Sequence, residues 1–123
     1  MALFAKLQGG ATAAPARPRT LVGTPEFTQA ARRDYAELVS TCGGPRLPAA
    51  FQVKTPPPAV QAAVDAFERQ HRGTAEVALN TIDGQRTYQV QIAHKGQAQV
   101  LLVDARGVEL ARGAVRGTTV AWR

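Results

Sequence analysis

The stretch from Thr74 to Leu110 constrains the fold most, because its apolar residues recur at every second position. A period of two is typical of β-strands that bury one face. The runs are separated by Asp83-Gly84, Lys95-Gly96 and Arg106-Gly107, and glycine supplies the positive φ that tight hairpins need. The pattern predicts an antiparallel meander, whose inner face consists of Val77, Leu79, Tyr88, Val90, Ile92, Val100 and Leu102.

The other face of this predicted sheet is polar. It carries the glutamines that alternate with the apolar residues, and we expect them to face water: Gln89, Gln91, Gln97 and Gln99. Phe51–Lys54, before a run of prolines, is a candidate for a short strand or an edge-pairing extension, and Thr118–Trp122 at the end of the chain is a candidate last strand. Trp122 is expected to close the edge of the core. The sheet should therefore have about four or five strands.

Two amphipathic helices are predicted before the meander. The first begins at Thr24-Pro25-Glu26, where threonine caps and proline suits the first position, and it stops at Gly43-Gly44. The second begins at Pro58 and stops at Gly73. Because the meander alternates on one side, we expect both helices on one face of the sheet, which gives an α+β fold.

A chain of 123 residues fits one domain. Residues 1–23 contain no acid and are rich in alanine, proline and arginine, so we expect a flexible basic arm. Residues 24–123 should form a single domain, with a helix and short strand over 24–57 and a helix and meander over 58–123. Lys6 interrupts the only apolar stretch of the N-terminus, and Cys42 is the single cysteine. These features predict a cytoplasmic protein without a leader or a membrane span.

The net charge of +6 raises the possibility of a polyanionic partner. The basic residues are spread along the whole chain, which favours a solvated basic surface. Nucleic-acid binding is nevertheless the alternative function, with mainly phosphate contacts. The residues that would carry it are Arg32, Arg33, Arg69, Arg72, Arg86, Lys95, Arg112, Arg116 and Arg123.

No catalytic motif is visible in the sequence. The reactive side chains are Tyr35, Tyr88, His71, His94 and Cys42, and neither histidine has an acidic or cysteine partner at a useful spacing. We therefore expect a non-enzymatic protein without cofactor, metal or small-molecule ligand. An enzyme stays open as a third class, because active sites are assembled from residues that are distant in sequence.

The unit from Pro58 to Leu110 resembles the PepSY domain family. The resemblance rests on the helix PAVQAAVDAFERQ, the hairpin IDGQRTYQVQIAHKG and the closing segment VLLVDARGVEL. It implies a helix packed across an antiparallel sheet, with Phe27–Cys42 plus Phe51–Lys54 as a degenerate partner repeat. It also implies an inhibitory or interaction module beside peptidases, without catalytic residues of its own.

The leading expectation is a non-enzymatic binding module. Its partner would be another protein or a second copy of the chain, docked on the open sheet face or on a sheet edge. The candidate edges are Phe51–Lys54 and Thr118–Trp122.

Overall fold

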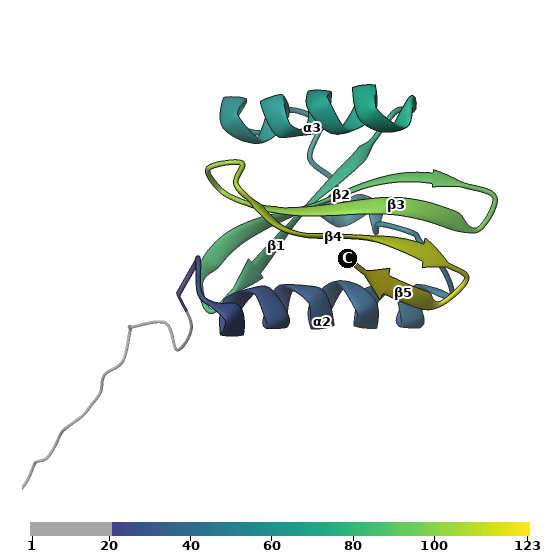
Figure 1. Cartoon of the computed structure of the whole chain (residues 1–123), viewed down its shortest axis with the longest axis horizontal. Coiled ribbons are helices and arrows are strands. Elements are labelled where there is room, and N and C mark those ends of the chain that lie inside the picture. Colours follow the sequence, from purple (N-terminus) through teal and green to yellow (C-terminus); the bar gives the residue numbers. More distant parts are fainter. Residues whose placement is uncertain (1–20) are drawn as a thin grey trace, which may run out of the picture.

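A computed structural model describes residues 21–123 of the chain, so residues 1–20 of the arm predicted over 1–23 lie outside the described part. The strands form one antiparallel sheet in the order β1-β2-β3-β4-β5 (Figure 1). This arrangement confirms the α+β class and the meander. The elements are α2 (Pro25–Cys42), η1 (Ala49–Phe51), α3 (Pro58–His71), β1 (Glu76–Ile82), β2 (Gln85–His94), β3 (Gln97–Asp104), β4 (Glu109–Arg116) and β5 (Thr119–Trp122).

Both helices begin where the sequence predicts. The Thr24 hydroxyl accepts a hydrogen bond from the Phe27 N–H at 3.3 Å, and α2 ends before Gly43, which has a φ of 74°. The second helix, α3, begins at Pro58 and ends at His71. Arg72, with a φ of 54°, forms the left-handed cap of α3 one residue before the predicted glycine.

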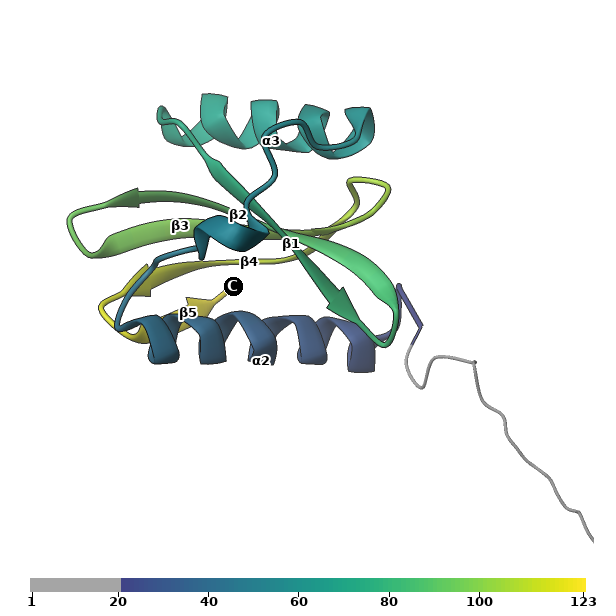
Figure 2. The ribbon, with the colours of Figure 1, turned by 180° about the vertical axis from the view of Figure 1, so that it is seen from behind.

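The two helices lie on opposite faces of the sheet, which corrects the expectation that they share one face (Figures 1 and 2). The core between α2 and the sheet includes Phe27, Tyr35, Val39, Ala78, Val100 and Leu102. The core between α3 and the sheet includes Val60, Val64, Phe67, Val77, Tyr88 and Val90. Each amphipathic helix therefore has its own face of the sheet to cover.

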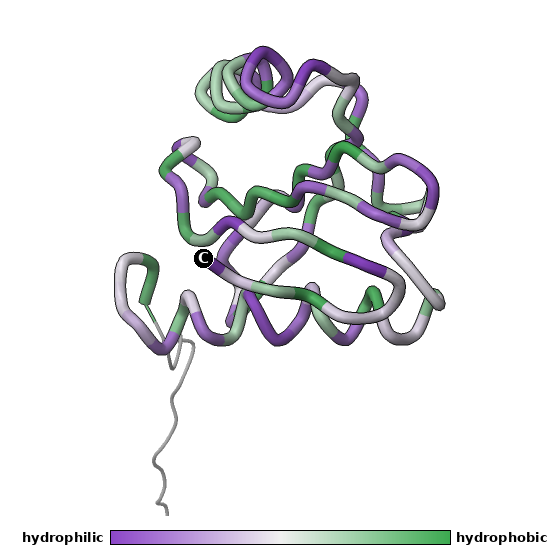
Figure 3. Tube along the Cα trace, turned by 45° about the vertical axis from the view of Figure 1, so that its right-hand side comes forward, coloured by the Kyte–Doolittle hydropathy of each residue, from purple (hydrophilic) through white to green (hydrophobic). Residues whose placement is uncertain are grey.

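The physical reason lies in β3, where Val100-Leu101-Leu102-Val103 is a continuous apolar run. A strand that is buried on both faces needs apolar residues at consecutive positions. Figure 3 shows hydrophobic stretches along the strands between the two helices. The predicted inner face is accordingly split between two faces. Val77, Leu79, Tyr88, Val90 and Ile92 pack in the α3 core, whereas Val100 and Leu102 pack in the α2 core.

Two of the glutamines that we expected to face water are buried under α2. In the β2–β3 register Gln91 pairs with Val100 and Gln89 with Leu102. The Tyr35 hydroxyl donates a hydrogen bond to Gln91 Oε1 at 2.7 Å, and Gln91 Nε2 donates to the Pro45 carbonyl at 2.9 Å. These partners make burial of the Gln91 amide tolerable. Burial also raises the pKa of Tyr35 above its ordinary value.

Of the other two glutamines, Gln97 is exposed as expected and Gln99 is partly buried. Trp122, at the end of β5, meets the Tyr35 ring edge-on with centroids 6.0 Å apart. It packs against the α2 core, which confirms that the tryptophan closes the core at this edge of the sheet.

The tight turns follow the glycine signals of the sequence. Asp83-Gly84 and Lys95-Gly96 have positive φ at both residues, as type I′ hairpins require. In the turn after β3, Asp104 Oδ1 accepts hydrogen bonds from the N–H groups of Arg106 at 2.8 Å and Val108 at 3.0 Å. The Asp104 side chain therefore stabilises the turn between β3 and β4 through the backbone.

The predicted strand over Phe51–Lys54 does not form. Ala49–Phe51 makes a short 3-10 turn, and only Gln52 bridges the sheet, opposite Ala78 of β1. The proline run and the 3-10 turn leave too little extended backbone for a ladder. The outer edge of β1 is consequently paired with the rest of the chain at one described position, the bridge between Gln52 and Ala78.

Candidate functional site

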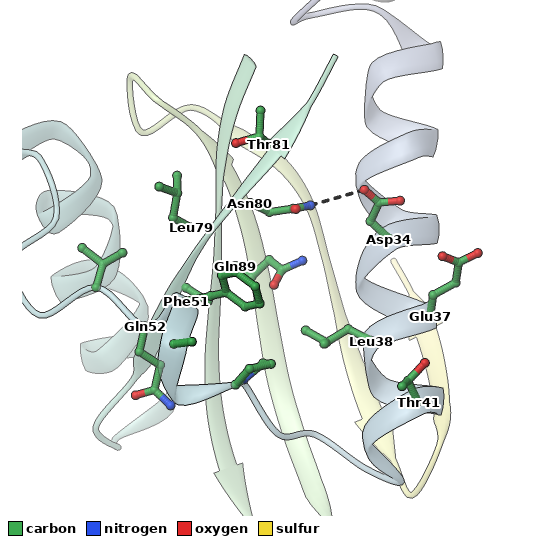
Figure 4. Close-up of a pocket in the computed structure, with 14 residues that line it drawn as sticks. Asp34, Glu37, Leu38, Thr41, Phe51, Gln52, Leu79, Asn80, Thr81 and Gln89 are labelled. Carbon is green, nitrogen blue, oxygen red and sulfur yellow. Dashed lines mark hydrogen bonds between the residues drawn. The ribbon is translucent and has the colours of Figure 1, made fainter. Parts of the chain in front are cut away.

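A cleft of about 870 Å³ lies between α2, η1 and the outer edge of β1 (Figure 4). The helix supplies Asp34, Glu37, Leu38 and Thr41 to its wall. The opposite side consists of the η1 segment and β1, and Gln89 reaches the cleft from β2. A second cleft of about 740 Å³ adjoins it along α2 and shares Asp34 and Thr81.

The cleft contains apolar surface that is open to solvent. Phe51 is 60% exposed, although large aromatic side chains usually lie inside a protein of this size. Leu38 and Leu79 are partly buried and line the same cleft. The η1 turn holds Phe51 in this position because it diverts the chain just before the Gln52 bridge.

The backbone of β1 offers unpaired hydrogen-bonding groups to this cleft. The Val53 N–H donates to the Val77 carbonyl at 2.8 Å, so the backbone groups of Val77 point outward from the sheet. Because outward groups alternate along an antiparallel strand, the carbonyl of Leu79 and both backbone groups of Thr81 also point outward. Within residues 21–123 no backbone group pairs with these three.

The Gln89 amide lies in the cleft and has no hydrogen-bond partner among residues 21–123. Its residue is only 5% exposed, and Figure 4 shows the amide between β1 and α2. The hydrogen bond drawn among the lining residues joins Asn80 Nδ2 to Asp34 Oδ2, at 3.4 Å, and does not involve Gln89. The amide atoms reach the solvent of the cleft, so a ligand there could replace water as their hydrogen-bond partner.

Two carboxylates from α2, Asp34 and Glu37, line the cleft beside these groups. In the described part of the chain, the ion pairs are Asp104 with Arg106 and Glu109 with Arg112, and neither involves the cleft. The cleft therefore combines a free strand edge, apolar surface, the Gln89 amide and two carboxylates that take part in neither of these ion pairs.

The five reactive side chains are not brought together. Tyr35 bonds Gln91, Tyr88 lies in the α3 core, and His71 packs edge-on against Phe67 with centroids 4.6 Å apart. His94 ends β2 and Cys42 ends α2. No hydrogen bond joins any two of them, and residues 21–123 hold no cluster of three or more potential metal ligands. The non-enzymatic nature of the protein stays a prediction.

The predicted basic residues lie on both sides of the sheet. Arg32 and Arg33 belong to α2, whereas Arg69 and Arg72 end α3. Arg112 of β4 donates to Gln70 of α3 at 2.9 Å, so this strand position faces α3. Three others lie in the hairpin strands and turns: Arg86, Lys95 and Arg116. The nine residues therefore do not form a single surface, and their contacts with nucleic acid stay a prediction.

One group of cations does gather at the end of α3. Arg112 donates to Gln70, the residue before His71, and burial together with the charges of Arg112 and Arg123 lowers the pKa of His71. Arg112 is held by Glu109 at 2.8 Å, and Arg123 donates to Gln99 at 3.4 Å.

Sequence reasoning identified Phe51–Lys54 as a docking edge but missed the cleft itself. Asp34 and Glu37 have the spacing of ordinary solvated residues on a helix, and Gln89 reads as a solvated strand residue. The apolar run of β3 was a signal that could have indicated the burial of Gln89. A strand buried on both faces requires its neighbour β2 to be covered on both faces too.

None of the helices in residues 21–123 is long and apolar enough to cross a membrane. The resemblance to the PepSY family stays a prediction that rests on the pattern from Pro58 to Leu110. Comparison of the chain with protein-family models, with curated proteins and with solved structures found no match.

Proposed function

We propose that this protein is a binding module that takes an extended segment of a partner protein along the outer edge of β1. The observation that carries this proposal is the unpaired edge of β1 where it opens into the cleft. A segment added to a sheet edge gains main-chain hydrogen bonds, and its side chains enter the pockets on either side. Leu79 and Thr81 supply the free backbone groups, and Gln89 supplies a further donor and acceptor.

The surroundings of this edge favour a single extended segment over a second copy of the whole sheet. α2 and the η1 turn flank the free part of β1, and both contribute lining residues to the cleft beside it (Figure 4). The pairing surface beyond the Gln52 bridge is also short. A second copy of the chain would be recognised in the experiment below as concentration-dependent self-association.

The free edge can be tested with Thr81→Pro. Because the Thr81 N–H points away from β2, proline there removes no sheet hydrogen bond but blocks strand addition. We expect a displayed peptide library to yield binders on the wild-type protein, and these binders to lose about tenfold or more in affinity on Thr81→Pro.

Thr81→Val is the matched control, since it keeps the backbone N–H and the β-branched shape. Its peptide affinities should equal those of the wild type, and thermal melting should show both variants folded. Equal binding by a folded Thr81→Pro variant, or no enrichment on the wild type, would contradict edge binding.

Nucleic-acid binding is a second candidate function, which the cluster of Arg112 and Arg123 beside the end of α3 favours. Clustered guanidinium groups attract phosphate, and such binding weakens steeply as salt increases. We expect labelled single-stranded DNA, duplex DNA or RNA to bind at low salt, and Arg123→Gln to reduce the log–log salt slope by about one. Arg86→Gln, outside the cluster, is the control. If none of these nucleic acids binds at low salt, the proposal of nucleic-acid binding is contradicted.

A further inference from the structure

We infer that the segment bound in the cleft carries a lysine or arginine beside an apolar side chain. This inference rests on the proposed peptide-binding function and adds the chemical class of the partner. Its basis is the charge of the cleft wall, together with the Gln89 amide and the apolar surface beside it.

The negative charge of the cleft is unusual for this chain. The sequence has 15 Lys and Arg against 9 Asp and Glu, yet the charged side chains that line the cleft are Asp34 and Glu37, and Asp34 accepts a hydrogen bond from Asn80. Their helical spacing of three places both carboxylates on one side of α2, where both line the cleft. A basic side chain of a partner would meet two carboxylates, and an arginine fork can bond a carboxylate through two N–H groups.

Gln89 is the independent second observation. Its amide has no hydrogen-bond partner among residues 21–123, and it lies under the same wall of α2. A glutamine amide both donates and accepts, so it suits the backbone or a polar group of a segment held beside Thr81.

The apolar surface of the cleft explains why the bound segment should also carry an apolar side chain. Leu79 packs in the α3 core, on the side of β1 away from α2, and Phe51 adds 60% exposed aromatic surface. Successive side chains of an extended segment point to opposite sides. A segment that directs a cation toward α2 therefore directs the next side chain toward the apolar side of the cleft.

The test uses the displayed peptide library on the full chain and on Asp34→Asn, Glu37→Gln and Asp65→Asn. On the wild type we expect binders with lysine or arginine at one position and an apolar residue next to it. Replacing that basic residue by glutamine should weaken a synthetic binder about three- to tenfold. Asp34→Asn and Glu37→Gln should cause the same loss and lower the salt sensitivity of binding.

Asp65→Asn is the matched control, because it removes the same charge from the exposed surface of α3 on the other face of the sheet. It should leave peptide affinity unchanged. Binders without a basic preference would overturn this inference and leave the proposed function standing, whereas no binders at all would overturn both. Binders that appear only after Lys6, Arg17 and Arg19 are changed to glutamine would assign the cleft to the chain's own N-terminal residues and overturn the partner assignment.

Discussion

Val90→Asp is expected to unfold the domain at ambient temperature. Val90 is 0% exposed and lies in the core between α3 and the sheet, paired in register with Val77 and Leu101. An aspartate there would place a carboxylate among apolar side chains, without a partner. The cost is several kcal/mol, which is comparable to the total stability of about 5–15 kcal/mol for a domain.

Ala93→Asp is the matched control for this prediction. Ala93 belongs to the same strand but is exposed near its end, so a charge there stays hydrated. Thermal melting followed by circular dichroism should show a cooperative transition for Ala93→Asp and no folded baseline for Val90→Asp. A wild-type melting temperature for Val90→Asp would show that the α3 face of β2 is not buried.

Gly107→Ala is expected to have the second largest effect, a loss of about 2–5 kcal/mol in the free energy of unfolding. Gly107 has a φ of 79°, which strains any residue with a Cβ. A Cβ at this position would also contact the carbonyl oxygen of Ala59, in the first turn of α3. The free-energy cost of the strained turn and the cost of displacing α3 add together.

Gly84→Ala separates these two costs. Gly84 has a φ of 77°, but a Cβ there would meet no other atom within 4 Å. Only the backbone strain remains, so we expect a loss of about 1–2 kcal/mol. Chemical denaturation of both variants measures the difference, which is the contribution of the contact between the β3–β4 turn and α3. Equal losses would mean that α3 does not pack against this turn in solution.

The local features of the fold could be predicted because short stretches of sequence determine them. The Asp83-Gly84 and Lys95-Gly96 hairpins follow from the positive φ that glycine permits. The start of α2 follows from the Thr24 hydroxyl, and its end follows from Gly43. The prediction of a strand over Phe51–Lys54 was wrong because the 3-10 turn includes Phe51 and prolines follow, so pairing with β1 is limited to the Gln52 bridge.

The candidate cleft could not be predicted, because it depends on segments that are distant in sequence. Asp34 reaches Asn80 across 46 positions, and the η1 turn meets β1 only through the Gln52 bridge. No single stretch of the sequence indicates that α2, the η1 turn and β1 lie next to one another. The acidic residues of α2 consequently have the pattern of an ordinary solvated helix surface.

By itself, the sequence determined the helices, the strands of the meander and their order, because turn chemistry and hydrophobic periodicity act over a few residues. The tertiary structure alone decided which face of the sheet each helix covers. Whether Gln91 faces water or the core depends on the hydroxyl of Tyr35, which lies 56 residues earlier in the chain. A polar strand residue is stable in either place, and only the helix packed over it provides or withholds the hydrogen-bond partner.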